Sequence, residues 1–593
     1  MALECRRLTP RAAISCRAPQ LRSAHVQGAV AVLVAIGMRF GSQLFASAGL
    51  LRTSALSSSS TADLAGASAH TWGISAGMQE WRYDKPRLPR AAKGDGRGSG
   101  ELRDLSNVAL LVHPDEGLPG FMQVAAAGGL IESESTSWTA AADQLARRVA
   151  WDIGPEEQVE FRTIGLQAFC DEAVENPAKY GIVLGVDLLS GPPSACTEAM
   201  RMVLSAANSR TFITSSQELA AQGPASFWRN LIKLGGVGID SLSQDGPLGS
   251  LAGLAGGWSS YAKLQQNLED LWHRRTAEEA VYAILVLIDE ALQPLESIRL
   301  QNPVPTFESL NAAIGNCQDE FRGCFTTPRC MQSLVCLSGC GMADQSCSYR
   351  CIVSYQTDAF TQFSLCALQK NNLLNSQVKR PALPEPQLME TFRGAPLTED
   401  VAEDILVGHY NPGTGKKFSW LVAAGSNPAY EQFALQHQLW YRGANGKSFW
   451  YHPTFLVESL DGQKIWRDRD YRVRRAGKPG LWDFSVLDNG ITSDERWHLL
   501  GADEDLEWIV LFYIGVAKKA GLTYRGCLIL TPDGSLPEST ASRQAVMAAV
   551  ARASLQPWEL EAVANPPIDP KNPPPLIAPE SQPAAPLLRV EAV

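Results

Sequence analysis

The chain is 593 residues long, which is enough for three or four domains, and its formal net charge is −10. Hydrophobic residues make up 45% and charged residues 19% of the sequence, as in ordinary globular proteins. Residues 1–69 hold seven arginines against two acidic residues, so the rest has 45 basic against 60 acidic residues, a net charge of −15. This balance argues against a nucleic-acid partner, because phosphate binding needs a basic face.

Residues 1–69 have the composition of a targeting peptide. They are rich in Arg, Ala and Ser, and no acidic residue lies between Glu4 and Asp63, which is typical of organelle transit peptides. An apolar run at 29–38, too short for the ~20 residues that span a bilayer, is followed by Ala-Ser-Ala sequences of an export-type signal. A two-part signal would direct the chain through the chloroplast stroma to the thylakoid lumen. The alternative is an N-terminus of chance composition.

After a linker at 70–104, residues 105–300 have the pattern of an α/β domain. Short apolar, β-branched runs predict strands at 108–112, 181–189 and 211–214. Helical patterns alternate with them at 121–127, 139–150 and 196–207, which predicts a partly parallel sheet. No Gly-rich phosphate-binding motif is present, so nucleotide binding has no support, and the role of this domain is not indicated.

A longer helix is predicted at 276–292, at the end of this domain. Thr276 and Glu279 form an S/T-x-x-E capping box at its start. Adjacent acids on a helix point in different directions, so we expect the pairs at 278–279 and 289–290 to lie on solvated faces rather than to act in catalysis.

Eight of the thirteen cysteines lie between residues 317 and 366, with gaps of 6, 5, 5, 3, 6, 3 and 14 residues. They are Cys317, Cys324, Cys330, Cys336, Cys340, Cys347, Cys351 and Cys366. An even number at short gaps predicts up to four disulfides in a small module at 315–370, in an oxidising compartment. Zinc is the alternative, but the window contains no histidine and no C-x2-C pair.

A second linker at 371–405 leads to a region with a period of two. It holds eight strand candidates separated by Gly-, Asn- and Pro-containing turns: 418–425, 432–442, 448–458, 463–474, 481–487, 495–500, 506–514 and 522–531. We expect an eight-stranded antiparallel β-barrel at 406–555, wide enough for one small ligand, with a helix at 539–553. Residues 556–593 form a Pro-rich tail.

The cysteine gaps, followed by a barrel region with seven of the fifteen tryptophans, resemble violaxanthin de-epoxidase and its relatives. In that family a cysteine-rich module precedes a lipocalin domain. Trp420, at the head of the first strand, resembles the lipocalin Trp that closes one end of the barrel. The founding enzymes' further cysteines and Glu-rich C-terminal segment are missing, so the chain looks like the de-epoxidase-related branch.

The segment N-P-A-Y-E-Q-F-A-L-Q at 427–436 resembles the family's N-P-x-F-D-x-F-D-C-Q run. Gln436 is retained, whereas Ala434 and Leu435 replace the second Asp and the Cys. The family's His lies two residues past this Gln, but His437 lies one past it. A shift of one residue in a strand turns a side chain to the opposite face, so His437 does not inherit that role.

A second family run, acid-x-Trp, falls on Glu495 and Trp497. The resemblance implies that Glu495 and Tyr513 are catalytic and that Gln436, Trp497 and Tyr524 shape the substrate pocket. Asp494 competes with Glu495 for the acid's role, a solvated Glu495 at a hairpin is the structural alternative, and a second family Tyr is replaced by Leu530.

The resemblance implies an oxidoreductase that acts on an epoxy-xanthophyll with ascorbate as the reductant and without a metal. A carboxyl buried among tryptophans has a raised pKa and can protonate the epoxide oxygen. The alternative is a non-catalytic carotenoid- or lipid-binding lipocalin of the thylakoid. Under both hypotheses the partner is an apolar small molecule, and peripheral contact with thylakoid lipid is compatible with either.

Overall fold

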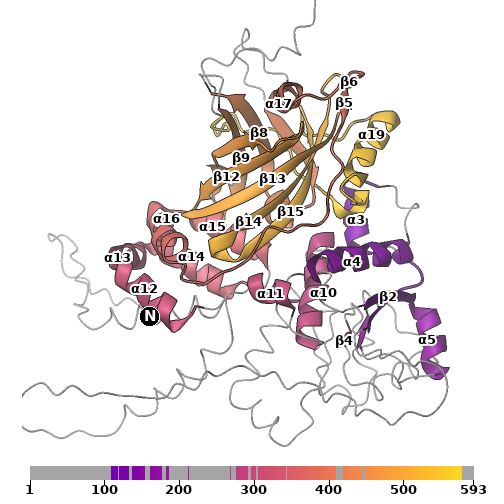
Figure 1. The fold of residues 1–593 in the computed structure, drawn as a ribbon, viewed down its shortest axis with the longest axis horizontal. Helices are drawn as coiled ribbons and strands as arrows, with labels where there is room; N and C mark the ends of the chain where they lie inside the picture. The colour runs from indigo at the N-terminus through magenta and orange to yellow at the C-terminus, as the bar shows by residue number, and fades with distance from the viewer. Residues whose placement is uncertain are drawn as a thin grey trace, which may run out of the picture.

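The structure, a computed structural model, describes residues 108–117, 119–131, 137–153, 160–175, 182–185, 211–212, 267–268, 271, 276–291, 295–301, 305–341, 344–408, 419–443 and 448–576. The predicted targeting peptide, the first linker and the helix at 196–207 lie outside these ranges. Figure 1 shows a β-barrel, a group of helices at one of its ends, and a small sheet with helices beside them. Among the described helices, none is both long enough and apolar enough to cross a membrane.

The small sheet is parallel, with the strand order β2-β1-β3-β4. Its strands are β1 (Val108–His113), β2 (Glu160–Gly165), β3 (Ile182–Gly185) and β4 (Thr211–Phe212). They are accompanied by helices α3 (Gly120–Ala127), α4 (Trp138–Ile153) and α5 (Leu166–Glu175). The predicted α/β pattern is confirmed in these residues. The sequence pattern predicted neither β2 nor α5. β2 is an edge strand that mixes polar with apolar residues, so it lacks the apolar run by which the other strands were predicted.

Helix α10 (Ala277–Ala291) confirms the predicted long helix, and α11 (Glu296–Gln301) follows it. The hydroxyl oxygen of Thr276 accepts a hydrogen bond from the Glu279 backbone N–H at 3.1 Å, as the capping box predicts. The expectation of solvated acids on this helix is wrong. Glu278, Glu279 and Asp289 are buried, because each carboxylate has a partner within the fold. The side chain of Glu290 lies outside the described residues.

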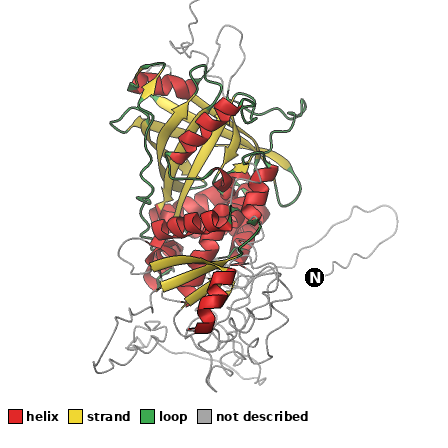
Figure 2. Cartoon of the chain, turned by 90° about the vertical axis from the view of Figure 1, so that its right-hand side faces the viewer, coloured by secondary structure: helices red, strands yellow, loops and turns green. Residues whose placement is uncertain are grey.

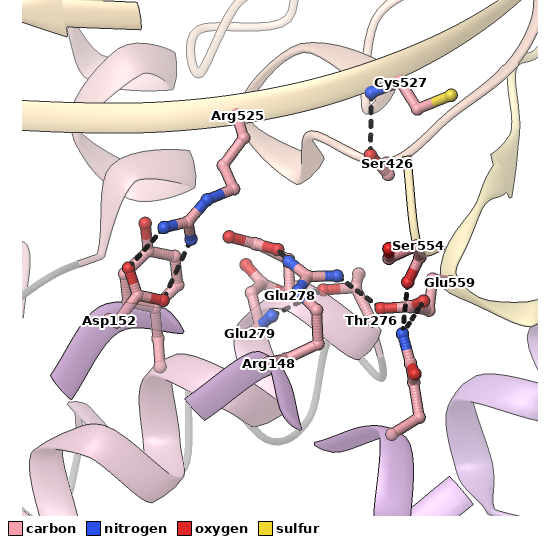
Figure 3. A network of polar contacts seen from close by, with 12 residues as sticks. Arg148, Asp152, Thr276, Glu278, Glu279, Ser426, Arg525, Cys527, Ser554 and Glu559 are labelled. Carbon is pink, nitrogen blue, oxygen red and sulfur yellow. Dashed lines mark hydrogen bonds and ion pairs between the residues drawn. The ribbon is translucent and has the colours of Figure 1, made fainter. Parts of the chain in front are cut away.

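A buried ion network joins the α/β part to the barrel (Figure 3). Arg148 of α4 pairs with Glu278 of α10 and with Glu559 in the short 3-10 helix η6 (Pro557–Glu559). Arg525, on a barrel strand, binds both carboxylate oxygens of Asp152 at 2.7 and 2.9 Å. Burial of all these side chains makes the network depend on complete pairing, because an unpaired buried charge is costly.

The cysteine-rich module is helical. It comprises α12 (Phe307–Asn316), α13 (Gln318–Thr326), α14 (Pro328–Gly339), α15 (Gln345–Tyr355), α16 (Asp358–Ser364) and the π-helix η3 (Leu365–Lys370). All eight cysteines are paired, as Cys317–Cys366, Cys324–Cys330, Cys336–Cys351 and Cys340–Cys347. The predicted disulfide framework is confirmed, and no thiolate of the eight is left to bind zinc.

The barrel is closed and antiparallel, which confirms the predicted fold. Its wall runs through β7 (Trp420–Gly425), β8 (Ala434–Arg442), β9 (Phe449–Glu458), β10 with β11 (Lys464–Asp468 and Tyr471–Arg475), β12 (Leu481–Asp488), β13 (Ile491–Ala502), β14 (Ile509–Ala517) and β15 (Leu522–Thr531). The strand expected at 463–474 is interrupted, so β10 and β11 both pair with β9. Helix α19 (Thr540–Ala551) confirms the helix after the barrel.

The two ends of the barrel are covered differently. At one end Trp420 is fully buried and donates a hydrogen bond to the carbonyl of Leu406 at 2.9 Å. Leu406 belongs to α17 (Glu399–Val407), which follows the small hairpin of β5 (Thr391–Phe392) and β6 (Ala395–Pro396) in the segment expected to be a linker. We call the other end the mouth. There the helices lie between the barrel and the parallel sheet (Figure 2).

We predict that the disulfides differ in their contribution to stability. Removing Cys317–Cys366, whose residues are 49 apart, should cost roughly 1–2 kcal/mol more than removing Cys324–Cys330, whose residues are 6 apart, because a longer loop restricts the unfolded chain more. The measurement is urea unfolding of the two paired Cys→Ser variants. Equal losses would contradict a chain-entropy effect.

The ion network yields a second prediction. Arg148→Met leaves Glu278 and Glu559 without their shared counter-charge and should lower the free energy of unfolding by about 3–5 kcal/mol. The control is Arg322→Met, which breaks the exposed pair with Asp319 and should cost about 1 kcal/mol or less. Similar losses in the two variants would show that the buried network is not stabilising.

Candidate active site in the barrel

Glu495 lies on β13 and points into the barrel, where its side chain is only 3% exposed. Its Oε1 accepts a hydrogen bond from the Tyr524 hydroxyl at 2.7 Å, and its Oε2 accepts one from the indole N–H of Trp497 at 2.6 Å. Asp494 is half-buried and accepts a hydrogen bond from Ser485 instead. The structure therefore places Glu495, not Asp494, inside the barrel, and Glu495 is not a solvated hairpin residue.

Burial raises the pKa of Glu495 to about 7, and the hydrogen bonds from Tyr524, Trp497 and Tyr471 partly oppose this rise. A carboxyl with this pKa is mostly protonated in mildly acidic medium. Glu495 can therefore act as a proton donor, and the adjacent Tyr524 hydroxyl can exchange a proton with it.

An aromatic stack keeps water from this carboxyl. The ring of Trp497 lies between those of Phe484 and Tyr513, at centroid distances of 4.9 and 4.7 Å and with nearly parallel planes. Tyr451 contacts the same stack, 5.4 Å from Trp497. The predicted pocket residue Trp497 thus has two roles, since it donates to Glu495 and packs against Tyr513.

Two tyrosines reach the interior because glycines lie opposite them. Tyr513 faces Gly526 and Tyr524 faces Gly515 across β14 and β15. A Cβ atom on either glycine would come within 2.4 Å of the facing tyrosine ring, so the rings need glycine at both positions.

The sequence predicted Tyr513 as the relay to Glu495. The structure gives that contact to Tyr524, whereas the Tyr513 hydroxyl accepts a hydrogen bond from Asn427 at 2.9 Å.

Gln436 does not reach Glu495 by a direct contact. Its amide donates to the carbonyls of Tyr430 and Phe433 at 2.9 and 3.1 Å, which fixes the loop before β8. The position two residues past Gln436 is Gln438, whose side chain accepts a hydrogen bond from Tyr451 inside the barrel.

His437 lies outside the ring stack. Its imidazole contacts Ser419 at 2.7 Å and Trp466, and burial lowers its pKa to about 4. This agrees with the expectation that His437 does not take the family His position. The lowered pKa keeps His437 neutral at physiological pH.

Sequence reasoning assigned no role to Asn427, Gln438, Tyr451 or Tyr471. Side chains of a strand alternate between its two faces, and Trp440 of β8 points into the barrel. Gln438 lies two residues before Trp440, so an inward side chain could have been expected there. Asn427 was matched in the 427–436 motif, but no sequence signal connects it with Tyr513, which lies 86 residues away.

A small cavity of about 10 Å³, room for one water, lies at the mouth between Tyr524, Asn427 and the residues of α10 and α15.

The described residues bring no unpaired set of metal ligands together at this site. The groups with suitable spacing are Cys340, Cys347 and Cys351, and Cys317, Glu320 and Cys366. The cysteines of both groups are held in disulfides.

Comparison with known proteins matches residues 309–565 to the model of the VDE lipocalin domain. No curated protein matches the chain. Similar solved structures include lobster apocrustacyanin A1 (14% identity, 31% of this chain and 94% of that one, TM-score 0.20) and H1 crustacyanin from the lobster Homarus americanus (11%, 31% and 93%, TM-score 0.20). The siderocalin Ex-FABP is similar over 25% of this chain and 94% of its own, with 10% identity and a TM-score of 0.20.

The family match covers both the helical disulfide module and the barrel, with its buried Glu495 and Trp497. The resemblance inferred from the cysteine gaps and the barrel motifs is therefore confirmed: residues 309–565 match the model of the VDE lipocalin domain.

Proposed function

We propose that the chain is a violaxanthin de-epoxidase-type oxidoreductase of the chloroplast thylakoid, which acts on an epoxy-xanthophyll with ascorbate as the reductant. The observation that carries this proposal is the dry, protonatable carboxyl of Glu495, held by Tyr524 and Trp497 inside a VDE lipocalin domain. A barrel that only held an apolar ligand would have no need of a buried acid, because burial of a carboxyl is unfavourable.

The reaction removes the epoxide oxygen as water. Glu495 donates a proton to the epoxide oxygen as a ring C–O bond breaks, and a second proton completes the water molecule. Ascorbate supplies two electrons and two protons and becomes dehydroascorbate, and a C=C bond replaces the epoxide. General-acid assistance of this kind is typically worth ~10²–10⁴ in rate.

The aromatic side chains would hold the ligand. Flat faces such as those of Trp497 and Tyr513 suit a conjugated polyene and its end ring. In the structure these rings pack against one another, so the end ring would separate part of the stack when it enters. Tyr524 borders both the mouth cavity and Glu495, which favours entry from the mouth.

A ligand-binding lipocalin without turnover is the second candidate, and specific residues favour it. Leu530 lies in the barrel core where the resemblance expects a Tyr. Gln438 occupies the position of the family His, and Ala434 and Leu435 replace an Asp and a Cys. Each change removes a group that could donate or relay a proton.

Turnover decides between the candidates. We predict that the oxidised protein converts violaxanthin in galactolipid micelles with ascorbate. Glu495→Gln should lower the rate by about 10²-fold or more, because it removes the acidic proton. The pigments are followed by chromatography. Tyr524→Phe should lower the rate by a smaller factor, while both variants still bind pigment. Binding without conversion across pH values on both sides of the Glu495 pKa would leave the lipocalin function in place.

The raised pKa also predicts how stability depends on pH. Since the pKa of Glu495 is about 7 in the fold and ordinarily 4.5, the folded state favours the neutral form. The contribution of neutral Glu495 to the free energy of unfolding is complete below about pH 4.5 and is lost as pH rises towards 7. The wild type should lose up to about 3 kcal/mol relative to Glu495→Gln over this window. A difference between the two unfolding free energies that does not vary with pH would contradict the assignment.

A further inference from the structure

A second buried carboxyl lies at the mouth of the barrel. Glu431 ends the short helix α18 (Pro428–Glu431), between β7 and β8, and is only 5% exposed. Neither of its carboxyl oxygens has a hydrogen-bond partner of normal geometry among the described residues. Almost every buried carboxyl in a protein is hydrogen-bonded or paired with a cation, so this arrangement requires an explanation.

The carboxyl of Glu431 points to the inner side of the barrel wall. A Cβ atom on Gly425 would come within 2.0 Å of its Oε1, so the glycine makes room for it. Gly425 pairs with Leu528, whose side chain belongs to the interior cluster with Trp497 and Tyr513. Side chains at paired positions lie on the same face of a sheet, so Glu431 occupies the interior face at Gly425.

The charges of Glu431 and Glu495 both influence the pKa of Tyr513. Burial is the main cause of the raised pKa of Tyr513, and the charges of Glu431 and Glu495 raise it further. The residue that caps α18, Asn427, donates to the Tyr513 hydroxyl. The Tyr513 hydroxyl hydrogen is therefore free to point towards a ligand or a carboxyl, because its oxygen is the acceptor for Asn427.

Burial also decides the charge state of Glu431. Loss of hydration raises the pKa of its carboxyl well above the ordinary value, and the charge of Glu561 on β16 (Glu561–Ala562) adds to this rise. The backbone N–H groups of Glu431 and Asn427 offset it only in part. Glu561 is half-buried, so it can pass protons between solvent and this region.

We propose that Glu431 is a second acid of the barrel, which supplies the second proton of de-epoxidation through the hydroxyl of Tyr513. This inference rests on the proposed function. Glu495 protonates the epoxide oxygen as the C–O bond breaks. The Tyr513 O–H then protonates the resulting hydroxyl oxygen, which leaves as water, and the Glu431 carboxyl returns a proton to Tyr513. The two electrons come from an enediol reductant, and its two protons restore both carboxyls.

The test compares five proteins: the wild type, Glu431→Gln, Glu431→Asp, Tyr513→Phe and Glu538→Gln. Glutamine keeps the shape of Glu431 but has no acidic proton, whereas aspartate retains one, and Glu538 is an exposed control for the same chemical change. Near-UV circular dichroism establishes that each variant is folded. Carbon-13 NMR of carboxyl-labelled glutamate follows protonation without substrate, and chromatography follows turnover.

We expect a neutral glutamate signal at about pH 7, in addition to those of Glu495 and Glu561, that is missing in Glu431→Gln and shifts in Tyr513→Phe. Turnover should fall by about 10²-fold in Glu431→Gln, recover in part in Glu431→Asp, and stay unchanged in Glu538→Gln. The Gln variant should also lose its normal pH profile, which a purely structural role would leave in place.

An ionised Glu431 at neutral pH, or wild-type turnover with an unchanged pH profile in Glu431→Gln, would overturn the inference. If the wild type shows no turnover, the proposed function fails. The NMR titration then still decides this site: a neutral Glu431 coupled to Tyr513 supports a proton store in the barrel, and an ionised one overturns it.

Discussion

The dehydration of a carboxyl group is the constraint on which this barrel depends. Water stabilises an ionised carboxylate far more than a single hydrogen bond does, so Glu495 can remain buried only with two donors, a raised pKa, or both. Tyr524 and Trp497 are the donors, and the parallel rings of Phe484 and Tyr513 exclude water from them. The same dryness raises the pKa of the Glu495 carboxyl, which keeps on it the proton that the proposed function requires.

The rest of the chain maintains this dry interior. Trp420 and α17 close one end of the barrel, and the disulfide module covers the mouth, where α15 contacts the loop that carries Asn427. The α/β part packs directly against the barrel. Its helices share one hydrophobic cluster with the outer face of the barrel, and the ion pairs of Arg148 and Arg525 connect the two.

Features set by local pattern could be read from the sequence, and features set by contacts between distant residues could not. Period-two alternation and turn residues located all eight barrel strands, and cysteine spacing located the module. Three features depend instead on register and packing. They are the connectivity of the disulfides, the ion pair of buried Glu278 with Arg148, and the contact of Glu495 with Tyr524 rather than Tyr513. Motif resemblance found Glu495, because the acid-x-Trp spacing places both side chains on the same face of a strand.

The most direct test of the account is an experimental structure of the protein with a bound epoxy-xanthophyll at mildly acidic pH. We expect the end ring inside the mouth, with its epoxide oxygen within hydrogen-bonding distance, about 2.5–3.2 Å, of the Glu495 carboxyl or the Tyr524 hydroxyl. A ligand bound outside the barrel, or one whose epoxide points towards Trp420 at the closed end, would contradict it.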